Sequence, residues 1–77
     1  MKPSLLKPGQ RVIVAGAFGA PMEMTFLRRL RPGFEIQLGR GAECLFQCEA
    51  FRGLNGPEDS GRCCMSDARV IRAVRPA

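Results

Sequence analysis

Residues 43–50 read Glu-Cys-Leu-Phe-Gln-Cys-Glu-Ala, and this stretch decides how the chain folds. Every second residue in it is small or apolar: Cys44, Phe46, Cys48 and Ala50. Such alternation is typical of a β-strand with one buried face, because successive side chains of a strand point to opposite sides. We therefore predict a strand whose cysteines and phenylalanine enter the core.

Upstream of this stretch the sequence predicts three more strands. Residues 11–15 are rich in β-branched side chains and lie between glycines, which indicates a short strand. Residues 34–38 alternate apolar and polar side chains without a fault, so we expect a strand with Phe34 in the core. Residues 21–31 fit a helix with proline at its first position, or a strand paired with 34–38 across a tight turn; the strand is favoured.

Downstream, the chain reads as a loop followed by two short runs. Residues 51–61 are rich in Gly, Asn, Asp and Pro and are expected to be a loop. The runs 62–67 and 68–74 are predicted strands, and Ser66 and Asp67 between them are placed to cap a single helical turn. The chain thus has five or six short strands, and we predict an all-β fold, a small, strongly bent antiparallel barrel.

The length and the ends of the chain bound its organisation. At 77 residues the chain forms one domain, residues 1–77, in which 1–8 and 75–77 are expected to be loosely ordered ends. The first residues lack the apolar stretch of a signal peptide, and no apolar run approaches the ~20 residues of a membrane span. We expect a cytoplasmic protein with reduced thiols and no membrane partner.

Two stretches resemble SH3-like barrels of the KOW type. Residues 7–21 are similar to their opening strand and glycine loop, with a match at Gly9, Val12, Val14, Gly16 and Phe18. Residues 63–74 resemble the closing strand, short helical turn and last strand of an SH3-like barrel. The resemblance implies that the predicted small barrel is SH3-like.

The thiols and the absence of histidine limit the chemistry. The chain has four cysteines and no histidine. On a strand, Cys44 and Cys48 lie about 13 Å apart, whereas two thiolates on one zinc ion lie about 4 Å apart. A zinc site and disulfides are the alternatives to buried free thiols, which we expect, with no metal and no cofactor. Without histidine the commonest general base is missing, so we expect no enzyme.

Positive charge is concentrated in the first half of the chain. The net charge is +5, and residues 1–40 alone hold seven basic against two acidic side chains. Arginine suits bidentate contacts with phosphate, and an exposed aromatic ring in a glycine loop could stack on a base. The candidate nucleic-acid-binding residues are Arg11, Phe18, Arg28, Arg29, Arg31 and Arg40. The later series Arg69, Arg72, Arg75 is expected to be a solvated face or tail.

Two functions follow from these observations. The first is a non-catalytic domain that binds the backbone of RNA or DNA through its arginine-rich surface. The alternative is a protein-interaction or assembly module, which would use apolar side chains that the core pattern does not need. Those side chains are Leu5, Leu6, Leu27, Leu45 and Leu54. The sequence leaves the oligomeric state open.

Overall fold

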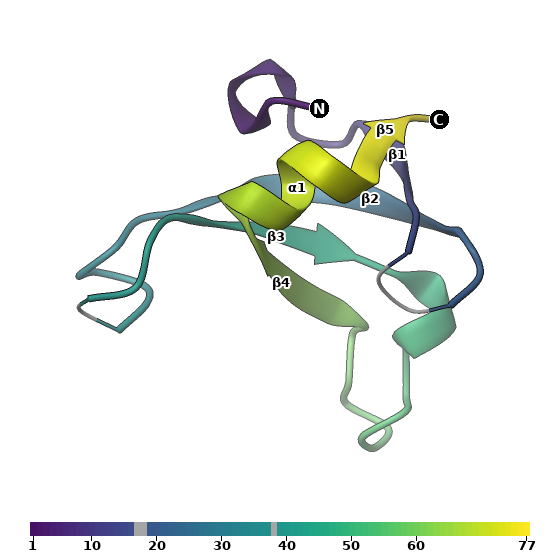
Figure 1. The fold of residues 1–77 in the computed structure, drawn as a ribbon. Coiled ribbons are helices and arrows are strands. Elements are labelled where there is room, and N and C mark those ends of the chain that lie inside the picture. Colours follow the sequence, from purple (N-terminus) through teal and green to yellow (C-terminus); the bar gives the residue numbers. More distant parts are fainter. Residues whose placement is uncertain (17–18, 38) are drawn as a thin grey trace.

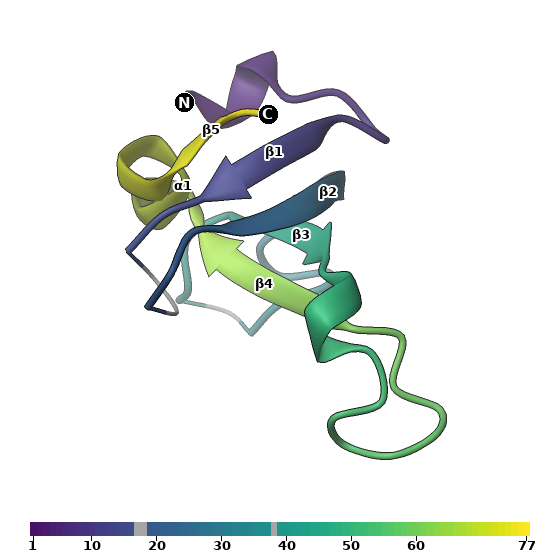
Figure 2. The ribbon, with the colours of Figure 1, turned by 90° about the vertical axis from the view of Figure 1, so that its right-hand side faces the viewer.

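The chain forms one antiparallel sheet with a short helix. The computed structural model describes residues 1–16, 19–37 and 39–77. In chain order, its elements are the 3₁₀ helix η1 (Pro3–Leu5), β1 (Arg11–Val14), β2 (Met22–Leu30), β3 (Glu43–Gln47), the 3₁₀ helix η2 (Glu49–Phe51), β4 (Arg62–Ser66), α1 (Asp67–Ala73) and β5 (Val74–Pro76). The five strands lie in the order β4-β3-β2-β1-β5 (Figures 1 and 2). Of the predicted all-β barrel of five or six strands, a five-stranded antiparallel sheet is confirmed, but the sheet is not closed, because β4 and β5 are its edges.

Residues 22–30 settle the helix-or-strand alternative in favour of a strand. β2 pairs with both β1 and β3, so it is the central strand of the sheet. A bulge at Leu27 shifts the register: Phe26 pairs with Phe46, but Arg28 pairs with Leu45. The next residue, Arg29, therefore shares its side of the sheet with the core residue Cys44.

The strand predicted at 34–38 is wrong. In the described part of this segment, Pro32 and Ile36 form only an isolated bridge, and a turn lies between them. The Arg31 carbonyl accepts hydrogen bonds from the backbone N–H groups of both Phe34 and Glu35, so the chain winds back on itself instead of extending. Phe34 is 86% exposed and is not in the core. β2 pairs instead with β3, across a connection that we call the arm, residues 31–42.

The core lies on one side of the bent sheet, under α1 (Figure 1). The prediction that Cys44, Phe46 and Cys48 are buried is confirmed. Ala50 is exposed, because β3 ends at Gln47 and Ala50 belongs to η2. The remaining buried members of the core are Leu6, Val12, Val14, Met24, Phe26, Met65, Val70 and Val74.

A second buried region lies on the opposite side of the sheet. Leu30 and Leu45 are buried there and are not part of the main core cluster. The arm lies along this side, because Glu35 forms an ion pair with Arg28, and Arg40 forms one with the buried Glu43. Leu45 is thus unavailable as the exposed apolar contact that the sequence suggested, and so is Leu6, which is in the core.

Residues 68–74 are mainly helix, so the strand predicted there is wrong. The Ser66 side chain accepts a hydrogen bond from the Arg69 backbone N–H, which confirms the predicted cap. The cap begins a helix of seven residues, longer than the single turn expected. Val70 is the buried residue of α1, and Val74, which is also buried, ends the helix in an extended conformation and begins β5. The last strand is β5, which pairs with β1.

The long connection between β3 and β4 contains the loop predicted at 51–61, and hydrogen bonds hold it in place. The Cys48 N–H donates to the Gly61 carbonyl at 2.8 Å and closes the 48–61 loop at its base. The Asp59 carboxylate accepts from the backbone N–H groups of Gly61 and Asn55. Leu54 lies in this loop and is 68% exposed. Whether residues 1–8 and 75–77 are loosely ordered concerns their motion and stays a prediction.

Candidate functional site

Four of the five predicted arginines are in ion pairs with carboxylates. Arg11, Arg28 and Arg40 lie on the side of the sheet away from the core, and Arg29 lies on the core side. Their partners, in chain order of the arginines, are Glu23, Glu35, Asp67 and Glu43. The side of the sheet away from the core therefore carries alternating charges, and the arginines on it are not a continuous positive stripe.

Arg29 serves a local structural role at the start of α1. Its guanidinium pairs with Asp67, and this hydrogen bond raises the pKa of Arg29. The other oxygen of Asp67 accepts a weak hydrogen bond from the Cys44 thiol, with 3.6 Å between sulfur and oxygen. Burial, followed by the Asp67 charge, raises the pKa of Cys44 to about 11. At neutral pH Cys44 is thus a protonated thiol, which is a poor nucleophile and a poor metal ligand.

The other two predicted binding residues are Phe18 and Arg31. Phe18 lies outside the described residues. Arg31 follows β2 directly, and its side chain has no ion pair or hydrogen bond with any described residue. It lines a shallow hollow of about 430 Å³ with Pro32 and Ala42, at the root of the arm.

The lysines and arginines that have no carboxylate partner within the described part of the chain lie mostly outside the predicted binding set. Of the 12 lysines and arginines, five are in ion pairs, counting Arg52 with Glu49, which leaves seven. Among the described residues, those without an ion pair are Lys2, Lys7, Arg31, Arg62, Arg69, Arg72 and Arg75. The series at Arg69, Arg72 and Arg75, expected to be only a solvated face or tail, therefore contributes three of these seven.

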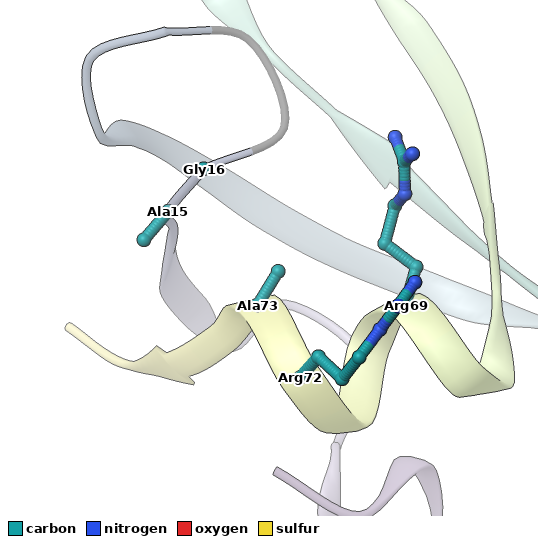
Figure 3. A pocket seen from close by; sticks show the side chains of 5 residues that line it. All are labelled: Ala15, Gly16, Arg69, Arg72 and Ala73. Atoms are coloured by element: carbon teal, nitrogen blue, oxygen red, sulfur yellow. The ribbon is translucent and has the colours of Figure 1, made fainter.

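Arg69 and Arg72 line a hollow between α1 and the end of β1. The hollow, which we call the α1 hollow, has a volume of about 330 Å³, and its other lining residues are Ala15, Gly16 and Ala73. Figure 3 shows the two arginine side chains on α1, with Ala73 between these side chains and Ala15 and Gly16 of the other wall. The backbone holds this geometry, because the Ala15 N–H donates to the Ala73 carbonyl at 2.9 Å. None of the described residues that line the hollow is acidic.

The sequence contained a signal for this pair of arginines. Arg72 is the third residue after Arg69, so a strand would place the two on opposite sides and a helix would place them on the same side. The strand predicted at 68–74 therefore placed the two arginines on opposite sides of the sheet. The N-cap at Ser66 was the observation that favoured a helix, and extending that helix to Ala73 would have brought the two arginines together.

The α1 hollow is suited to bind an anion. Two guanidinium groups offer planar, bidentate donors for phosphate oxygens, and the other described residues that line the hollow are alanine and glycine. Within the described residues, no three His, Cys, Asp or Glu side chains are placed together to hold a metal ion. No helix in the described part of the chain is long and apolar enough to cross a membrane. Comparison with protein-family models, curated proteins and solved structures finds no match to this chain.

Proposed function

We propose that this chain is a small, non-catalytic nucleic-acid-binding domain that contacts backbone phosphates through the α1 hollow. One observation carries the proposal: Arg69 and Arg72 lie side by side on α1 without an acidic partner among the described residues. Most carboxylates of the chain are paired with other arginines, so the net charge of +5 comes from the lysines and arginines without an ion pair to a described residue, which include Arg69 and Arg72. Phosphate contacts of this kind supply most of the affinity of non-specific nucleic-acid binding.

We further propose that the fold is an SH3-like barrel. Four strands follow one another in chain order across the sheet, and the last strand returns to pair with the first. A short helix precedes that last strand, as the resemblance implies. The proposal adds to the five-stranded sheet a curvature strong enough to bring β4 toward β5, and it supports a binding role only by analogy.

The predicted set at Arg11, Arg28, Arg29 and Arg40 has a secondary role in this proposal. Each of these arginines would have to exchange a carboxylate for a phosphate, and the lost ion pair offsets part of the gain. The free arginines have no such exchange to make. We therefore expect phosphate affinity to depend more on Arg69 and Arg72 than on the four paired arginines.

A salt-dependent titration tests the proposal. Fluorescence anisotropy of a labelled 20-nucleotide strand would be measured with the wild type and with Arg69→Ala/Arg72→Ala at several salt concentrations. Binding should weaken as salt rises, and the slope of log affinity against log salt should become shallower by about 1.4 in the variant, since each phosphate contact contributes about 0.7 on a single strand. The control Lys7→Ala/Arg62→Ala removes the same charge from two exposed positions outside the hollow.

Two results would reject the proposal. The first is that the wild type binds neither RNA nor DNA at low salt. The second is that the control variant loses as much affinity as Arg69→Ala/Arg72→Ala, because the effect would then report net charge and not a site.

A protein-interaction module remains the second candidate, and a specific observation favours it. Leu54 is 68% exposed on the hydrogen-bonded 48–61 loop, and Leu5 is 60% exposed on η1. Apolar side chains presented by ordered segments are typical of contact surfaces between proteins. Sedimentation velocity over a range of concentrations would detect self-association, and Leu54→Asp would show whether this side chain is responsible.

A further inference from the structure

The turn in the arm exposes an aromatic ring, that of Phe34, to solvent. Phe34 is 86% exposed, the most exposed of the large hydrophobic side chains among the described residues. The turn that carries it is closed by three backbone hydrogen bonds, two to the Arg31 carbonyl and one from the Gly33 N–H to the Ile36 carbonyl at 3.1 Å. The ion pair between Arg28 and Glu35 ties the same turn to β2. The ring is therefore held out by an ordered segment.

Burying this ring would stabilise the fold substantially. Burial of a phenylalanine side chain is worth about 1.5–3 kcal/mol, and the sheet has a buried region on the arm's own side, at Leu30 and Leu45. Ile36, two residues further along the arm, is partly buried, whereas Phe34 projects from the turn. A ring left outside by an ordered turn is placed to contact a partner.

The charge around the ring identifies the chemistry of that partner. The acidic residue next to it, Glu35, is already paired with Arg28. At the base of the same turn, Arg31 has no ion pair with any described residue and lines an open hollow with Pro32 and Ala42. The backbone hydrogen bond from Phe34 to Arg31 places an exposed ring and a free guanidinium in the same turn, and this combination fits a ligand with a planar ring and a negative charge. An unpaired nucleobase with its phosphate has that combination.

The arm is also connected to the α1 hollow. The Asp67 backbone N–H donates to the Ala42 carbonyl at 3.2 Å, so the end of the arm is attached to the first residue of α1. Figure 1 shows the arm leaving the sheet at the end where α1 begins. Arg69 follows Asp67 by two residues and belongs to the hollow. The start of α1 thus lies between the hollow and the arm that carries Arg31 and Phe34.

We propose that Phe34 stacks on an unpaired base, which makes single-stranded nucleic acid the ligand of this chain. The inference rests on the proposed function and deepens it, since phosphate contacts at the α1 hollow alone do not distinguish single strands from duplexes. Bases of a duplex are covered by their neighbours, so only an unstacked base offers its face to a ring.

The test compares Phe34→Ala with the wild type on a single strand and on the duplex of the same sequence. We expect Phe34→Ala to weaken single-strand binding by about 5- to 150-fold, the range of one base–aromatic stack, and to leave duplex binding and the salt slope unchanged. Phe34→Trp should retain the affinity, and Phe34→Leu should lose it, because leucine keeps the apolar surface without the π-face. Leu54→Ala is the matched control, an exposed apolar side chain on the other long loop.

The outcomes separate this proposal from the proposed function. If the wild type binds single strands and Arg69→Ala/Arg72→Ala weakens binding, but Phe34→Ala does not, the stacking role is rejected and phosphate binding stands. Equal losses of single-strand and duplex binding would also reject it. If no nucleic acid binds at all, both proposals fail. Far-ultraviolet circular dichroism of Phe34→Ala should match the wild type, because an exposed ring contributes nothing to the core.

Discussion

Replacing Gly61 with alanine should destabilise this protein far more than the same change at another glycine. Gly61 lies in the left-handed region, with φ of +81°, at the base of the 48–61 loop. A Cβ atom there would collide with the Cys48 carbonyl oxygen and would lie 3.0 Å from the Arg52 backbone nitrogen. Gly9 is the matched control, because its φ is +85° and a Cβ atom there would meet nothing within 4 Å.

The difference between the two variants measures the collision. Both alanines carry the left-handed backbone strain of about 1–2 kcal/mol. Only the alanine at position 61 also collides with the Cys48 carbonyl oxygen at the base of the loop. The collision weakens the two hydrogen bonds that Gly61 makes there, with Cys48 and with Asp59. Loss of one or both of these bonds adds about 1–3 kcal/mol. A chain of this length has a total stability of only about 4–12 kcal/mol, so the added loss should be easily measurable.

Urea denaturation monitored by circular dichroism is the assay. With a urea m-value of about 1 kcal/mol/M for a small domain, the midpoint of Gly61→Ala should lie about 1–3 M below that of Gly9→Ala. Equal midpoints would refute the reasoning, since they would show that the loop base yields to a methyl group without cost. A normal midpoint for both variants would refute the positive φ at these glycines as well.

The remaining predictions concern the helix cap and a thiol. Ser66→Ala removes the hydrogen bond to the Arg69 N–H and should lower the free energy of unfolding by about 1 kcal/mol, whereas Ser66→Asp should restore it in the same urea assay. Burial raises the pKa of Cys44 to about 11, so as the pH rises the unfolded chain, with an ordinary thiol pKa of about 8.5, loses this proton first. The stability that Cys44 contributes is therefore present below about pH 8.5 and falls as the pH approaches 11. Urea melts at pH 7.5 and 10 should show a smaller decline for Cys44→Ala than for the wild type.

Sequence analysis found the strands whose pattern places one face in the main core. In β3 the alternation of Cys44, Phe46 and Cys48 predicted the strand and the side that enters this core, but not that Glu43 and Leu45 on the other side are buried as well. At 34–38 the same alternation was misleading. Alternation shows which residues would share a face, but whether a partner strand lies alongside depends on the turn, and here the turn at Arg31 closes on itself.

The site was harder to predict, because charges are neutralised by residues far apart in the sequence. Arg29 and Asp67 are 38 residues apart, and only the fold brings them into contact. The basic cluster at 28–31 therefore looked like free charge in the sequence. To place Arg69 and Arg72 together, the sequence had to be assigned a helix and not a strand at this point, and in the fold that helix is held by the burial of Val70 in the core.

The bulge at Leu27 gives one strand two different interiors. Before it, Phe26 points into the core below α1; after it, Leu30 points into the buried region on the arm's side. At this end the sheet has a covered surface on both sides, a local three-layer arrangement, whereas the start of β2 has only one. A deletion of Leu27 would remove the bulge and leave Arg28, Arg29 and Leu30 on their present sides, because Arg28 would then follow Phe26 directly and stay opposite Leu45. A regular strand that kept Leu27 opposite Leu45 would instead turn Arg29 away from Asp67 and Leu30 away from the arm, so the extra residue is what places both side chains.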